Sequence, residues 1–219
     1  MDRSDINCCR LFFNKFGFEM IRKALLFLIL LMMAHGVSAQ TEDVIETLTS
    51  TASAMKSMQC RFEQKKNMEM LEQPTYSEGR MCYIAPDKMR WEYTKPLEFA
   101  LVVAGDKITK ITDGKEEVVD SKSSRMYQGI VSIIMSSATG KNLFDKSTFD
   151  VTISDAGDYW KAEMKPKKRD MKRMFSMLTF YFEKERNIIN KVEYTEAGGD
   201  VTTIQFLDII INKNIELCD

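Results

Sequence analysis

The chain has 219 residues, of which 44% are hydrophobic and 29% charged, and its 31 basic and 32 acidic side chains nearly cancel. This length suffices for one domain with a substantial core. The near-equal numbers of positive and negative charges give no indication of nucleic-acid binding. The only histidine, His35, lies in a segment that we expect to be removed. Its loss excludes Ser-His-Asp and Cys-His catalysis and histidine metal sites from the mature chain.

The amino-terminal part has the pattern of a secretory signal peptide. Arg22 and Lys23 precede an apolar run, residues 24–33, which is too short to span a bilayer. Small residues follow and end at Ala39, where cleavage is expected. A retained membrane anchor is the alternative interpretation of the same run.

Met20 stands where such a signal peptide would start, so residues 1–39 are expected to be an upstream extension plus the signal peptide. The residue after the predicted cut is Gln40, and no lipid-attachment cysteine is available there. We therefore expect a soluble mature protein in which residues 40–219 form a single domain.

A helix is predicted first in this domain. Thr41 can cap it, and acidic residues follow in the first turn. From Gln59 the apolar period changes from helical spacing to two, which predicts a strand. The apolar stripe of the helix is expected to comprise Val44, Ile45, Leu48, Ala52, Met55 and Met58.

The stretch from residue 79 to 103 is the most informative part of the chain. Its apolar residues alternate with polar or smaller ones, and Pro86 and Pro96 divide it into three short predicted strands. The resulting face needs a cover, because it is made of large apolar side chains. Those side chains are Met81, Tyr83, Met89, Trp91, Tyr93, Phe99, Leu101 and Val103.

Further strands follow, with one interruption. Asp113-Gly114 is a strong hairpin signal. A dense apolar cluster at residues 126–137, with Ile130, Ile133 and Ile134, predicts a short helix that is too apolar to stay exposed. Strands resume at residue 148, and residues 165–173 form a basic segment that we interpret as a loop, either solvated or facing an anionic partner.

These elements predict a mainly β protein with some helix, a long antiparallel meander of about ten strands. Open sheets of that size curl, and the two helices are the obvious lid over the concave face. Flexible methionines on that face suit either ordinary core packing or a ligand cavity, and the residues alone leave these two alternatives equal.

No catalytic motif is present: the chain lacks a phosphate-binding glycine loop, G-x-S-x-G, C-x-x-C and H-E-x-x-H. We therefore expect a protein that is not an enzyme and uses no cofactor or metal. After residue 39 the cysteines are Cys60, Cys82 and Cys218. Cys60 and Cys82 fall on strands expected to pair, so either a disulfide between them or two buried thiols is open.

One series of motifs resembles a known family. The chain has F-x-Q-K at residues 62–65, then Gly79, then P-x-x-x-x-W-x-Y-x-x-P at residues 86–96, and a strand that ends in Gly105-Asp106-Lys107. This order, with a signal peptide before it, resembles the periplasmic lipoprotein carrier family LolA. The resemblance extends over most of residues 41–210.

The resemblance implies a half-open antiparallel β-barrel with a helical lid over a hydrophobic cavity. Such a carrier takes acylated lipoproteins from an inner-membrane, ATP-driven release complex and delivers them to an outer-membrane acceptor. It implies a periplasmic monomer that binds no nucleic acid. Ile130, Ile133 and Ile134 are expected in the lid. The expected cavity residues are Phe62, Met81, Tyr83, Met89, Trp91, Phe99, Leu101 and Val103.

One position departs from the family pattern. The family often has arginine immediately before the first proline, where it helps to hold the lid closed, and this chain has Ala85. Lid closure is therefore expected to differ. The alternatives for function are a carrier of another lipid and a periplasmic sensor or interaction domain that transports nothing.

Overall fold

The computed structural model describes residues 41–119 and 143–215. The chain divides into two compact units, Met1–Val44 and Ile45–Asp219, and the account below concerns the second. A helix covers residues 41–53 and ends before the first strand, and its Leu48 and Ala52 are buried. The predicted stripe is therefore correct up to Ala52. Met55 is buried but lies after the end of the helix, and Met58 is a buried residue of the first strand.

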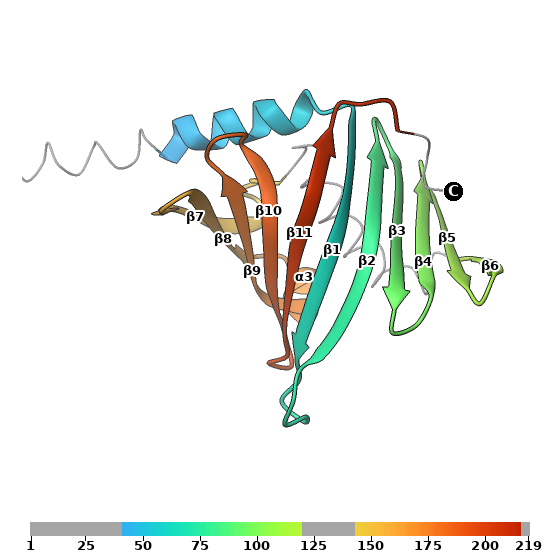
Figure 1. Cartoon of the computed structure of the whole chain (residues 1–219). Helices are drawn as coiled ribbons and strands as arrows, with labels where there is room; N and C mark the ends of the chain where they lie inside the picture. Colours follow the sequence, from blue (N-terminus) through green and yellow to red (C-terminus); the bar gives the residue numbers. More distant parts are fainter. Residues whose placement is uncertain (1–40, 120–142, 216–219) are drawn as a thin grey trace, which may run out of the picture. The chain divides into compact units, whose positions relative to one another are not determined.

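Eleven strands form one antiparallel sheet (Figure 1). Alternation in the sequence predicts strands at residues 107–112, 115–120, 148–154, 159–165, 175–182, 188–195 and 201–211, and each of these boundaries lies within two residues of the observed one. The strands are β1 Ser57–Asn67, β2 Thr75–Ile84, β3 Lys88–Lys95, β4 Phe99–Ala104, β5 Lys107–Thr112, β6 Lys115–Val118, β7 Phe149–Ala156, β8 Tyr159–Pro166, β9 Phe175–Glu183, β10 Ile188–Glu196 and β11 Val201–Ile211.

The strand order is β6-β5-β4-β3-β2-β1-β11-β10-β9-β8-β7. The prediction of a single long meander is therefore incomplete, because the first and last strands pair with each other in the middle of the sheet. Two meanders extend from this central pair and end at β6 and β7. These two strands flank residues 119–148 in the sequence. The predicted helix with Ile130, Ile133 and Ile134 lies outside the described residues.

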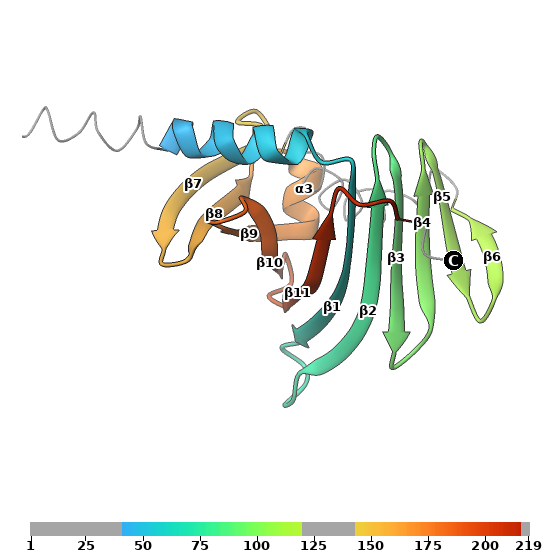
Figure 2. The same ribbon diagram turned by 45° about the horizontal axis from the view of Figure 1, so that its top comes forward.

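The sheet is strongly curved: Figure 2 shows β7 to β9 turned out of the plane of β1 to β5. The strands that the structure describes do not close into a full barrel, since β6 and β7 are the two ends of the order. The prediction of a mainly β, half-open and curled antiparallel sheet is confirmed. The lid that was expected to cover it remains a prediction.

The sequence predicts a loop for the basic segment at residues 165–173, but only part of this segment is a loop. It contains a short helix, α3, at Arg169–Met174, between β8 and β9. Asp170 lies in its first turn and Lys172 and Arg173 in its last. An acid near the start of a helix and bases near its end both interact favourably with the helix dipole.

The cysteines answer a question that the sequence left open. Cys60 is a free, buried thiol, so no disulfide joins it to Cys82. Cys82 is disulfide-bonded, and its partner lies outside the described residues. Burial raises the pKa of the Cys60 thiol to about 12, which keeps it protonated and chemically inert.

Candidate lipid-binding face

The apolar side chains of the 79–103 stretch lie in register across three strands. Met81, Trp91 and Leu101 form one cross-strand row. A second row aligns Tyr83 with two further residues of the predicted set. Because residues two apart on a strand share a face, both rows lie on one side of the sheet, which we call the inner face. The second row consists of Tyr83, Met89 and Val103.

Nearly every predicted cavity residue is buried. Phe62 is 1% exposed and Trp91 is 3% exposed, and only Phe99 is half-buried. The structure therefore brings all eight predicted residues of the described chain together on a covered apolar face. The other buried members are Met81, Tyr83, Met89, Leu101 and Val103.

Aromatic rings continue this face across the centre of the sheet. Phe62 stacks on Trp91 with ring centroids 4.2 Å apart, and Trp91 meets Phe206 of β11 edge-on at 6.1 Å. Tyr93 contacts Phe62 at 5.2 Å and Phe99 at 6.1 Å. Tyr93 and Phe206 were not among the predicted site residues. The period-two alternation of residues 201–211, which places Ile204 and Phe206 on one side, was the available signal for Phe206.

Gly79 makes the stacking possible. Gly79 is on β2, and its cross-strand neighbours are Phe62 of β1 and Tyr93 of β3. A Cβ atom built at this position would lie 2.6 Å from Cε1 of Phe62 and closer still to the backbone oxygen of Glu92. The bare backbone therefore lets the Phe62 ring lie over β2 and reach Trp91.

Two tyrosines bring hydroxyl groups to this otherwise apolar face. The Tyr93 hydroxyl donates a hydrogen bond to Oε1 of Gln64 at 2.8 Å. Burial raises the pKa of Tyr93 to about 12. The pKa of Tyr83 is also raised, mainly by burial and to a smaller extent by the nearby Asp87 carboxylate. Both hydroxyls therefore stay neutral at physiological pH, and the face carries no charge at these positions.

Charged groups lie on the opposite side of the same strands. Arg80 and Arg90 both donate hydrogen bonds to the carboxylate of Glu92, between β2 and β3. Partial burial opposes the effect, but these two hydrogen bonds lower the pKa of Glu92 overall. The sheet is thus amphipathic, with an apolar inner face and a charged outer face.

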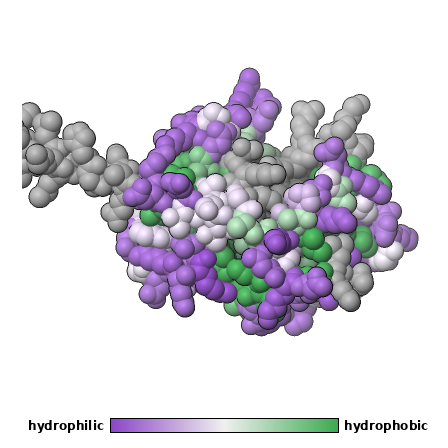
Figure 3. Space-filling model, turned by 90° about the horizontal axis from the view of Figure 1, so that it is seen from above, coloured by the Kyte–Doolittle hydropathy of each residue, from purple (hydrophilic) through white to green (hydrophobic). Residues whose placement is uncertain are grey.

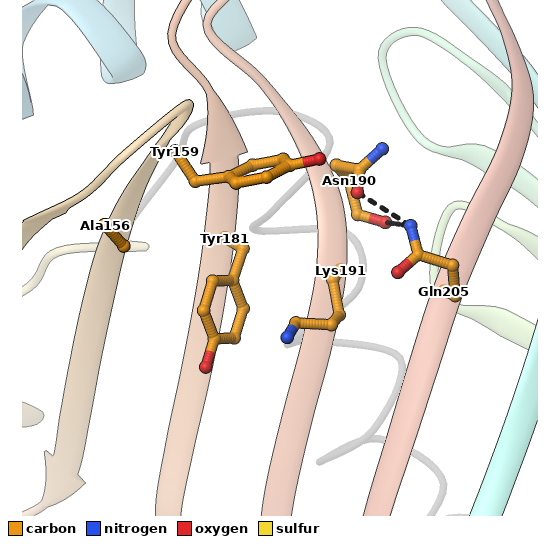
Figure 4. A pocket seen from close by; sticks show the side chains of 6 residues that line it. All are labelled: Ala156, Tyr159, Tyr181, Asn190, Lys191 and Gln205. Carbon is orange, nitrogen blue, oxygen red and sulfur yellow. Dashed lines mark hydrogen bonds between the residues drawn. The ribbon is translucent and has the colours of Figure 1, made fainter.

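The outer face also carries a pocket of about 260 Å³, shown in Figure 4. Its lining is mixed, with aromatic rings beside polar groups: Lys191 Nζ lies 3.6 Å from the centroid of the Tyr181 ring, and Gln205 donates hydrogen bonds to Asn190. Asn190 lies at an irregularity in the β9–β10 register. Amide and ammonium groups do not suit a hydrocarbon chain, so this pocket is not the expected acyl site.

The described surface is largely hydrophilic in the view from above, with hydrophobic residues gathered in a few patches (Figure 3). Among residues 41–119 and 143–215, no three His, Cys, Asp or Glu side chains come together in a group that could hold a metal ion. In the same ranges, no helix is long and apolar enough to cross a membrane.

Ala85, where the expected gate arginine is absent, is exposed in the turn between β2 and β3. Its amide donates a hydrogen bond to the Lys56 carbonyl at 2.8 Å. This bond fastens the turn to the segment that precedes β1. A methyl group offers no charge or hydrogen bond to a lid.

Comparison with protein families gives a match over most of the chain. The model described as "Outer membrane lipoprotein carrier protein LolA" matches residues 53–216. An outer-membrane lipoprotein carrier protein of Legionella pneumophila (strain Corby) is 27% identical over 194 residues, covering 87% of this chain and 90% of the relative. Its counterpart in Pseudomonas syringae pv. syringae is 25% identical, with 81% and 82% covered.

A solved structure shares the fold. The complex structure of Pseudomonas aeruginosa MucA/MucB contains a chain that superposes with a TM-score of 0.51 at 10% identity. The match covers 80% of this chain and 58% of that one. At this identity the likeness concerns the fold alone.

Proposed function

Because the chain belongs to the LolA family of outer membrane lipoprotein carrier proteins, we propose that it carries lipoproteins by sheltering their acyl chains on the inner face of the sheet. The observation that supports this most directly is the continuous covered face formed by Phe62, Trp91 and their apolar neighbours. It offers hydrocarbon, aromatic and thioether surface with neutral tyrosines and no charged side chain among the predicted cavity residues.

The energetics of such a site suit a carrier. Each buried methylene contributes about 0.8 kcal/mol, so sheltering ten of them contributes roughly 8 kcal/mol. This holds an acyl chain in water and still allows its release to an acceptor with a better site. Methionines such as Met81 and Met89 adapt to acyl chains of different shape.

The carrier would depend on other proteins for direction and energy, since the sequence has no nucleotide-binding motif. We propose that it is exported through cleavage after Ala39 and acts in the periplasm as a single domain of residues 40–219. It would receive cargo from an ATP-driven inner-membrane release complex and deliver it to an outer-membrane acceptor. The segment with Ile130, Ile133 and Ile134 is proposed as the lid.

Tryptophan fluorescence can test the site directly, since the chain has only Trp91 and Trp160. A Trp160→Phe variant leaves Trp91 as the reporter, and titration with an acylated lipopeptide should shift its emission. The same peptide without acyl chains is the control and should cause no shift. Binding of the lipopeptide without a Trp91 response would place the site elsewhere, and no binding at all would refute the carrier function.

Substitution of the face gives a second test. Met89→Glu or Trp91→Glu should weaken lipopeptide binding, because each places a carboxylate without a partner on the inner face. Both positions are buried, so the folded state of each variant must be verified by circular dichroism. Full cargo retention by a folded variant would contradict the proposal. Free phospholipid as a competitor separates a lipoprotein carrier from a carrier of another lipid.

A second candidate function is a periplasmic interaction domain without transport. The MucA/MucB complex, whose fold resembles this one, favours it by being an assembly of two proteins. Purification of the protein from cells followed by mass spectrometry separates the two. Acylated lipoproteins among the bound material support the carrier, whereas an empty site with a stable protein partner supports the interaction domain.

A further inference from the structure

Positive charge is concentrated at one place in the described chain: the end of β8, the two residues that follow it, and α3. Figure 2 shows where β8 and α3 lie. Six Lys and Arg side chains lie in this part of the chain, and all of them are exposed. The chain as a whole has a net charge of −1, so this concentration is a strong local departure from the average. We call the group the basic patch, and it consists of Lys165, Lys167, Lys168, Arg169, Lys172 and Arg173.

Three acids lie near these six cations, so at most half of the positive charge is offset. Asp170 is the only acid within the segment, and its carboxylate lies 4.0 Å from Arg173 with both side chains exposed. Asp150 is the cross-strand neighbour of Lys165. Asp145 accepts hydrogen bonds from Ser147 and Thr148 and also interacts electrostatically with Lys168. The patch therefore retains an excess of positive charge that faces solvent.

The composition of the patch indicates the kind of partner. Four of its six cations are lysines, and its segment, residues 165–173, contains no aromatic residue. Protein–protein interfaces are depleted in lysine and enriched in aromatic residues, so this composition does not favour a specific protein interface. Clusters of four to eight Lys or Arg instead are typical of surfaces attracted to anionic lipid headgroups.

We propose that the basic patch docks the protein on the surface of an anionic bilayer. The attraction needs no fixed geometry, because long lysine side chains reach phosphate groups individually and each adds to the binding. Docking of this kind is reversible and falls off within a Debye length. It is independent of acyl binding on the inner face, since none of the proposed cavity residues belongs to the patch.

The test is co-sedimentation of the cargo-free protein with vesicles. Wild-type protein should bind mixed phosphatidylglycerol–phosphatidylcholine vesicles, bind pure phosphatidylcholine vesicles far less, and dissociate as salt is added. Reversal of three charges, Lys167→Glu with Lys168→Glu and Arg169→Glu, should lower the partition coefficient by about 100-fold or more. The conservative variant Lys168→Arg should bind like wild type.

A matched control reverses three exposed lysines elsewhere: Lys88→Glu, Lys107→Glu and Lys115→Glu, which lie on β3, β5 and β6. This variant has the same net charge and should retain most of the binding. Equal loss in both triple variants would overturn the assignment to the patch. Equal binding of wild-type protein to both vesicle types would overturn it too, as would binding to polyglutamate but to neither vesicle, which would indicate an acidic protein surface.

A measurement of acyl binding separates a failure of the docking proposal from a failure of the proposed carrier function. The patch variant should still shift Trp91 emission on lipopeptide titration, since the inner face is unchanged. Loss of vesicle docking with intact lipopeptide binding supports the proposal. Loss of both in a variant whose circular dichroism matches that of the wild type would overturn it, because the patch would then belong to the acyl site.

Discussion

Phe62 on β1 stacks against Trp91 on β3 although β2 runs between their strands, and the ring centroids are only 4.2 Å apart. Neighbouring strands are about 4.8 Å apart, so a contact between strands two positions apart requires the middle strand to give way. It does so at Gly79, which has no side chain to block the Phe62 ring. The apolar face is thus organised around an absent side chain.

Gly79→Ala should therefore lower the free energy of unfolding by about 3 kcal/mol, because the new methyl group meets backbone and ring atoms that cannot both move away. Urea denaturation measures the change. Gly198→Ala is the control, since a Cβ there meets no atom within 4 Å, and it should change stability by no more than about 0.5 kcal/mol. Equal effects of the two substitutions would show that Gly79 is not needed for packing.

Tyr93→Phe should lower the free energy of unfolding by about 1 kcal/mol, because Gln64 loses the hydroxyl that donates to its side-chain oxygen. Thermal or urea denaturation is the measurement. Tyr76→Phe is the matched control: Tyr76 is 65% exposed, and its substitution should be nearly neutral. A neutral Tyr93→Phe would mean that water replaces the hydrogen bond without loss.

Cys60 should resist alkylation by iodoacetamide in the folded protein, because it is buried and its thiol is protonated. Denaturant without reductant should make Cys60 reactive, while Cys82 stays protected by its disulfide until a reductant is added. Peptide mass spectrometry follows each site. Rapid labelling of Cys60 under native conditions would show that the packing around this buried residue of β1 opens readily.

The stability of the protein should fall as the pH rises from about 9 towards 12. The ordinary pKa of a cysteine thiol is 9.0, and burial in the folded protein raises the pKa of Cys60 to about 12. In this window the unfolded chain loses a proton that the folded chain retains, so alkali favours unfolding. The contribution has a slope of at most about 1.4 kcal/mol per pH unit.

Cys60→Ala removes this contribution, so its unfolding free energy should fall less steeply with pH than that of the wild type. Denaturation series at several alkaline pH values provide the slopes. The variant loses some packing at every pH, and the comparison is therefore between slopes and not between absolute stabilities. Identical slopes would show that Cys60 does not ionise on unfolding in this window.

The strands were predictable because their alternation is strong and their turns carry clear signals. Asp113-Gly114 lies between β5 and β6 as expected, with both residues at positive φ. Local patterns do not encode which distant strands pair, so the junction of β1 with β11 was not foreseen. Met58 was misassigned for a related reason: its spacing fits the helix and the strand equally well.

The members of the inner face could be named from the sequence, but their packing could not. Period-two alternation placed Met81, Tyr83, Met89 and Trp91 on one side, and the register confirms it. The contact between Phe62 and Trp91 depends on Gly79, and the contact between Trp91 and Phe206 depends on the pairing of β1 with β11. Such contacts follow from topology, which single-sequence periodicity does not contain.

The pairing of β1 with β11 also constrains how the molecule folds. Phe62 and Phe206 face each other across this pair although they stand near opposite ends of the described chain. Closing so long a loop costs entropy before the contact contributes any stability, and folds dominated by such pairings form slowly. The strands β1 to β6 and the strands β7 to β10 can each pair with their sequence neighbours first. β1 and β10 cannot be joined until β11, the last strand, is available to lie between them. The sheet is therefore completed only when the last strand has been added.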